Sequence, residues 1–228
     1  MTFIKTTLST LLFALFVLMC NISNGQSTKG HIPFYALPYY NYDPLSITIG
    51  KYKNDLLTND TSELMQLADK IKSDINNTDI ESLFFLSIRL YDLGKKDDAF
   101  YWFHTAKARA IVFMDMLDPK KTGSIGDKPF ELKQFFISTT QIVGEYLNGY
   151  GFNDIDKAIA MIEKVKSEIK NIQSYKQVYK DIHFVNDEKL ITEKTEGEER
   201  LSKLIDYIKS HKDEIKKQRV ENGIQDKY

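Results

Sequence analysis

The stretch Leu83–Ala110 (LFFLSIRLYDLGKKDDAFYWFHTAKARA) decides the fold of this chain. Its first half is a run of large apolar side chains that stops at Gly94, and its second half is rich in aromatic residues and begins near Asp97. A glycine directly after an apolar helical run is a typical helix end. The stretch therefore predicts two helices joined by a tight turn, which is a helical hairpin.

This hairpin resembles one unit of the tetratricopeptide or Sel1-like repeats. The resemblance is carried by Leu83, Leu86, Ser87, Leu90, Gly94, Ala99, Phe103 and Ala106. A poorer echo of the pattern lies between Val143 and Ala158. The resemblance implies hairpins packed in the manner of such repeats and a role in protein–protein binding, because these folds present concave surfaces. An ordinary antiparallel hairpin would produce much of the same pattern.

The chain beyond residue 60 has helical periodicity almost throughout. The expected helices cover residues 60–75, 78–93, 97–117, 130–147, 154–169 and about 196–220. We expect Asp60 to cap the first of these, a capping box of Thr78 and Glu81 to open the second, and Gly149 and Gly151 to end the fourth. The fold class predicted is all-α, with antiparallel helical hairpins in a single domain over residues 60–222.

Residues 26–59 hold Pro33, Pro38 and Pro44 among several tyrosines. Proline fixes φ and removes a backbone donor, so this segment is expected to be an extended arm rather than a helix. Within it, Ser46–Ile49 could form a short edge strand.

Residues 1–25 predict a secretory signal. Lys5 supplies the positive charge, and Leu8–Met19 forms an apolar run that is too short to span a membrane comfortably. The small residues before Gln26 predict cleavage there, and hence an exported protein of the periplasm or the exterior. The alternative is lipidation of Cys20, which would anchor the protein in a membrane; Met19 departs from the residues preferred before a lipidated cysteine.

The composition argues against several classes of function. The chain carries 31 basic and 32 acidic residues, well interspersed, so no nucleic-acid partner is expected. Its single cysteine is Cys20, and its four histidines lack metal-binding spacing. We therefore expect no catalytic motif, no metal site and no cofactor.

The candidate binding residues are Arg89, Trp102 and Arg109. Trp102 and Arg109 are seven residues apart, so they share one helix face, and arginine is favoured at interfaces and in buried ion pairs. The alternative role for the arginines is an internal salt bridge, for instance to Asp92 or Asp115. The aromatic run of residues 100–103 cannot all be buried by one helix face, because consecutive residues step 100° around the axis.

These observations predict an exported helical protein that binds another protein. The string Trp102–Arg109 is similar to sequences of small bacterial proteins encoded near antibacterial toxins, which implies an immunity protein or other toxin inhibitor. The alternatives are an exported hydrolase with an unrecognised active site and a lipoprotein scaffold subunit. A deep cleft that gathers carboxylates or histidines from several helices would favour the hydrolase.

Overall fold

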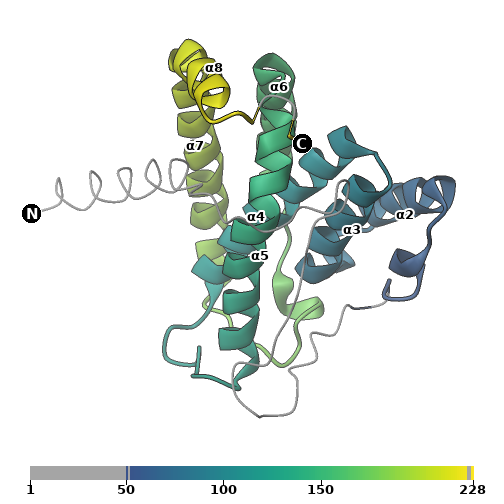
Figure 1. The fold of residues 1–228 in the computed structure, drawn as a ribbon. Helices are drawn as coiled ribbons and strands as arrows, with labels where there is room; N and C mark the ends of the chain where they lie inside the picture. Colours follow the sequence, from purple (N-terminus) through teal and green to yellow (C-terminus); the bar gives the residue numbers. More distant parts are fainter. Residues whose placement is uncertain (1–49, 51, 225–226) are drawn as a thin grey trace, which may run out of the picture.

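The computed structural model describes Gly50, residues 52–224 and residues 227–228, and over these residues the protein is all-α, as expected. Seven α-helices lie in this part of the chain (Figure 1): α2 (Thr61–Ser73), α3 (Ile80–Asp92), α4 (Lys96–Met116), α5 (Lys128–Gly151), α6 (Ile155–Ile169), α7 (Glu188–Ser210) and α8 (Lys212–Glu221). The predicted signal, Cys20 and the expected strand at residues 46–49 lie outside the described residues.

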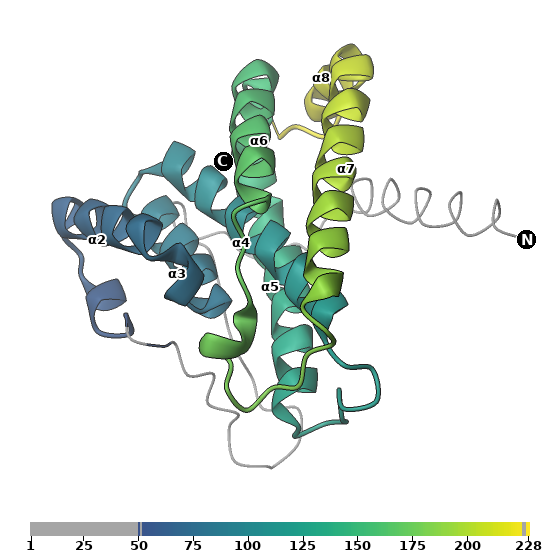
Figure 2. The ribbon, with the colours of Figure 1, turned by 180° about the vertical axis from the view of Figure 1, so that it is seen from behind.

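Helix α4 is the centre of the structure, packing against α3, α5, α6 and α7. Figures 1 and 2 show α2 and α3 together on one side of it and the antiparallel pair α6 and α7 on the other. The α3–α4 pair makes the most extensive helix contact, so the hairpin predicted from Leu83–Ala110 is present. The turn between them depends on Gly94, whose φ of +77° favours glycine.

The aromatic run at the start of α4 is buried by several helices rather than by one, as the 100° step between consecutive residues requires. Phe100, Tyr101, Trp102 and Phe103 are all buried. The 100° step does send their side chains in different directions, but each direction holds another helix. Phe103 meets Phe84 of α3 edge-on, whereas Phe100 packs with isoleucines of α6 and α7. A helix surrounded on most sides can bury consecutive residues.

The helix starts follow the expected capping chemistry, with one shift. Asp60 caps α2, and its side chain accepts hydrogen bonds from the backbone N–H groups of Ser62 and Glu63 at 2.7 and 3.1 Å. The predicted capping box at Thr78 is wrong by one residue, because Asp79 is the N-cap of α3 and accepts from the Ser82 N–H at 2.8 Å. Glu81 therefore does not form the predicted capping box, and its hydrogen bond is described with the candidate site.

Helix α5 continues through Gly149 and ends at Gly151, so the predicted end is confirmed at Gly151 and wrong at Gly149. Both allow a close approach of another part of the chain. A Cβ at Gly151 would overlap the ring of Phe100, and one at Gly149 would overlap the ring of Tyr228. Gly149 is therefore explained by packing alone, whereas Gly151 both ends the helix and allows a close contact.

The C-terminal third departs most from expectation. Helix α7 begins at Glu188 rather than near residue 196, and the helical path is interrupted at His211 before α8. The connection between α6 and α7 is irregular apart from a 3₁₀ turn at Tyr175–Gln177. Its end pairs with the end of α4 through an antiparallel bridge between Leu117 and Phe184. Across the residues that the structure describes, no helix is long and apolar enough to cross a membrane.

The glycines give a test of the packing. Gly151→Ala should lower the free energy of unfolding by about 1–3 kcal/mol, because the new methyl group must displace Phe100. Gly197→Ala is the matched control within α7, where a Cβ would meet Ile169 and Val112 at ordinary distances of 3.4–3.6 Å. It should raise stability by about 0.5–1 kcal/mol through helix propensity. Urea denaturation measures both changes, and equal effects at the two positions would contradict this account.

Candidate functional site

A groove runs between α2 and α6, with α4 as its floor, and we refer to it as the α2–α6 groove. It consists of two cavities of about 190 and 150 Å³. The first cavity is lined by Lys72, Ile75, Thr105, Ala108, Arg109, Val165, Glu168, Ile169, Asn171 and Ile172. The second is lined by Met65, Ala68, Asp69, Lys72, Asp97, Asp98, Tyr101, Trp102, Met161 and Lys164. Lys72 borders both cavities, which places them next to each other along the groove.

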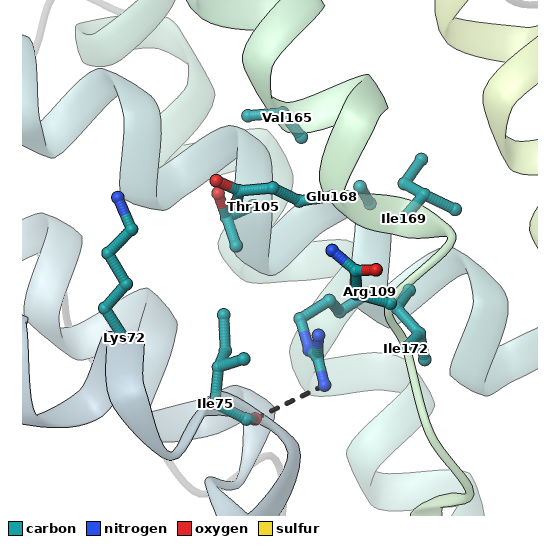
Figure 3. Close-up of a pocket in the computed structure, with 10 residues that line it drawn as sticks. Lys72, Ile75, Thr105, Arg109, Val165, Glu168, Ile169 and Ile172 are labelled. Atoms are coloured by element: carbon teal, nitrogen blue, oxygen red, sulfur yellow. Dashed lines mark hydrogen bonds between the residues drawn. The ribbon is translucent and has the colours of Figure 1, made fainter.

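The groove follows from how the flanking helices are held. Helix α2 packs on α3, whereas α6 packs on α4 and α7, so the two helices stand on opposite sides of α4. Figure 3 shows Lys72 on one side of the first cavity and Glu168 and Ile169 on the other, with Thr105 and Arg109 between them. The floor and both walls therefore contribute polar groups to one small space.

Arg109 is the most constrained polar residue of the groove. Its side chain is only 6% exposed. Its Nη2 donates to the carbonyl of Ile75 at 3.3 Å and to Asn76 Oδ1 at 2.8 Å (Figure 3), while its Nε has no hydrogen-bond partner in the described structure. Burial lowers the pKa of Arg109 from its usual value. The site thus contains a largely desolvated cation with a donor to spare.

Tyr101 and Glu168 join the two cavities. The Tyr101 hydroxyl donates to Glu168 Oε2 at 2.6 Å. Burial, reinforced by this carboxylate, raises the pKa of Tyr101 above its usual range. The ammonium groups of Lys164 and Lys72 lie 4.6 and 5.4 Å from the centre of the Tyr101 ring, one from each wall. These cation–π contacts place positive charge along both edges of the groove.

The three candidate residues from the sequence do not form one exposed face. Trp102 and Arg109 do share the α4 face that floors the groove, as their spacing predicts, but Trp102 is only 3% exposed. Arg89 lies elsewhere: its Nε donates to the Leu56 carbonyl at 3.1 Å, and its Nη2 to the Thr58 carbonyl at 2.7 Å. It therefore holds the segment before α2 against α3.

The two suggested salt bridges have different outcomes. Arg89 does pair with Asp92, at 3.7 Å. Asp115 pairs instead with Arg200, at 2.8 Å. Among the described residues, no ion pair involves Arg109, so the buried arginine of the groove lacks the carboxylate partner that the sequence suggested for it.

Sequence reasoning missed a buried acid at the start of α3. Glu81 accepts a hydrogen bond from the Tyr179 hydroxyl at 2.5 Å, and the same hydroxyl accepts from the Ile80 N–H at 2.8 Å. Burial raises the pKa of Glu81 to about 7; the hydrogen bond from Tyr179 opposes this shift, and the charge of Asp79 adds to it. No sequence signal links residues 98 positions apart. Neither cavity of the groove includes this pair, which fastens the α6–α7 connection to α3.

The described residues contain no group of three or more His, Cys, Asp or Glu side chains that could hold a metal ion. The chemistry that the groove does offer is recognition by hydrogen-bond donors, aromatic surface and charges of both signs, since Asp69, Asp97, Asp98 and Glu168 line it beside Lys72, Lys164 and Arg109.

Comparison with known proteins leaves the function to be inferred from this geometry. No protein family model matches the chain, and no solved structure matches it. The chain is similar to an uncharacterized protein of Haemophilus influenzae, with 27% identity over 149 residues. Those residues are 63% of this chain and 54% of the other protein, so the chain spans about half the length of the curated relative it matches.

The Glu81–Tyr179 pair predicts a pH dependence. The pKa of Glu81 is about 7 in the folded chain against an ordinary 4.5, so folding takes up a proton between these values. Its stabilising contribution is complete below pH 4.5 and is lost as the pH rises through 7. The free energy of unfolding of the wild type, relative to that of Glu81→Gln, should therefore fall by at most about 3 kcal/mol as the pH rises over this range. Urea denaturation measures both values.

Two features of the design isolate Glu81. Buried His104, whose pKa burial and nearby Lys107 lower to about 3, is present in both chains and cancels in the difference. Glu163→Gln is the control of opposite sign, because hydrogen bonding and charge from Lys166 and Lys209 lower the pKa of Glu163. The stability of the wild type relative to Glu163→Gln should therefore decrease as the pH falls. If the difference in unfolding free energy between the wild type and Glu81→Gln does not vary with pH, the Glu81 carboxyl is not desolvated.

Proposed function

We propose that this protein is exported and binds another protein, as an immunity protein or other inhibitor of a bacterial toxin. The observation that carries the proposal is the α2–α6 groove, which we infer receives a segment of the partner. A groove between helices is a common setting for ligand and peptide binding.

The residue types of the groove support binding to a protein. Trp, Tyr, Arg and Met are enriched in protein–protein interfaces, and Trp, Tyr and Arg dominate their binding energy. The groove gathers these types in Tyr101, Trp102, Arg109, Met65 and Met161. Its floor is rigid, because α4 is held by four other helices. A preorganised floor reduces the ordering cost of binding.

The α3–α4 hairpin gives a second line of support. We propose that it is a tetratricopeptide-like or Sel1-like unit, and such units serve protein–protein binding. Export is supported by the charged and apolar pattern of residues 1–25.

The hydrolase alternative finds less support in the geometry. Glycosidase-type hydrolysis needs two carboxylates across a cleft, and the first cavity contributes Glu168 alone, with its Oε2 bonded to Tyr101. The second cavity is lined by three acids, Asp69, Asp97 and Asp98. Of these, Asp97 accepts a hydrogen bond from Tyr150 and pairs with Lys157 at 2.5 Å. The scaffold alternative depends on Cys20, which lies outside the described residues.

A capture experiment tests the proposal. The protein, tagged at its C-terminus and produced from the full chain, is isolated with its partners from the cell envelope and analysed by mass spectrometry. We expect one stoichiometric protein partner. The Lys72→Glu, Lys164→Glu double variant should reduce its recovery at least tenfold, because charge is reversed on both walls of the groove.

Lys203→Glu, an exposed change on α7 that lines neither cavity, is the matched control and should retain the partner. Circular dichroism of all three proteins checks the fold. Equal recovery with the groove variant would show that the α2–α6 groove is not the interface, and the absence of any partner would contradict the function itself.

A further inference from the structure

We infer that the first cavity of the α2–α6 groove binds one carboxylate, an Asp or Glu side chain of the bound protein segment, through the Nε–H of Arg109 and the hydroxyl of Thr105. This inference rests on the proposed function, since it assigns chemistry to the segment that the groove receives.

The first argument is that two buried donors of the cavity have no partner. By distance and angle, neither Arg109 Nε nor Thr105 Oγ1 has a hydrogen-bond partner in the described structure, although their residues are only 6% and 4% exposed. The Thr105 hydroxyl does lie near enough to Tyr101 to lower the pKa of that tyrosine, which opposes the larger effect of burial. An unsatisfied buried polar group costs about 1–3 kcal/mol, and native proteins leave few of them. Residues 105 and 109 are four apart on α4, so their side chains lie on one face (Figure 3). A single acceptor that enters from the cavity could satisfy both once the side chains that cover these two atoms move aside.

The second argument is charge. Lys72 and Arg109 bring two positive charges to the lining of the first cavity, and Glu168 brings one negative charge. Glu168 is already bonded through Oε2 to Tyr101 and forms no ion pair with Arg109 among the described residues. One additional carboxylate would make the cavity neutral. Carboxylates are the anions to which guanidinium groups bind most readily in protein interfaces.

The third argument is size and access. A cavity of about 190 Å³ is small beside the roughly 300–1,000 Å³ of pockets that enclose a whole small-molecule ligand. It suits the end of a side chain. Because Lys72 borders both cavities, a protein segment that lies across the groove could direct one acidic side chain into the first cavity.

The first test separates a functional hydroxyl from a structural one. Thr105→Val keeps the shape and removes a hydroxyl without a protein partner, so it should leave stability unchanged or raised. Thr139→Val is the matched control, because Thr139 is also buried with an unpartnered Oγ1 but lines neither cavity. Both variants should fold. Only Thr105→Val should weaken carboxylate binding, by at least tenfold.

Binding is measured by NMR on the ¹⁵N-labelled protein produced from the full chain, using the Nε–H resonances of its four arginines. The probe is N-acetyl-glutamate amide, and N-acetyl-glutamine amide is the neutral control. We expect a saturable shift of the Arg109 resonance with the glutamate probe alone. Arg89, Arg200 and Arg219, which are engaged elsewhere, should not respond.

Three outcomes would overturn the inference. No saturable shift, or the same shift with the glutamine probe, would leave the cavity as a water-filled space. A shift with N-acetyl-alanine alone would assign it to a chain terminus instead of a side chain. A partner that is captured through the groove but unaffected by Thr105→Val would preserve the proposed function while removing this carboxylate site.

Discussion

The burial of α4 on most of its surface is the constraint on which the rest of the structure depends. Four helices pack against it, and each takes a different side, so the consecutive aromatic residues at its start all find apolar neighbours. One strip of the α4 surface lies between α2 and α6, and neither of these helices covers it completely. That remaining strip is the floor of the α2–α6 groove. The same requirement that builds the core therefore also positions the candidate site.

Arg109 shows how a core helix can carry a binding group. Burying a guanidinium without a carboxylate is costly, and proteins have only about 5–15 kcal/mol of net stability from which to offset such costs. Bonds to Ile75 and Asn76 satisfy part of its donor capacity. The remaining unsatisfied donor is a local departure from good packing, and such departures in natural proteins tend to be located at functional sites.

The fold was largely predictable from sequence because its signals are local. Periodic apolar residues, the Asp60 cap and the turn at Gly94 each act over a few residues, and so the hairpin and the all-α class follow from them. The site was only partly predictable. A seven-residue spacing places Trp102 and Arg109 on one face, but their burial depends on α2 and α6. The role of Arg89 depends on backbone carbonyls more than 30 residues away. Gly149 was misinterpreted as a helix end because local rules do not distinguish a helix end from a close contact.

The α6–α7 connection has a consequence for how the molecule assembles. Tyr175 bonds to the carbonyl of Arg109 at 2.8 Å, and Tyr179 bonds to Glu81, so a segment from the last third of the chain is fastened to both helices of the central hairpin. Contacts between residues so distant in sequence close large loops and form late relative to local hairpins. One wall of the groove, α6, leads directly into this segment. The α2–α6 groove is therefore complete only in the fully folded molecule, and a nascent chain that has formed only its first hairpin lacks it.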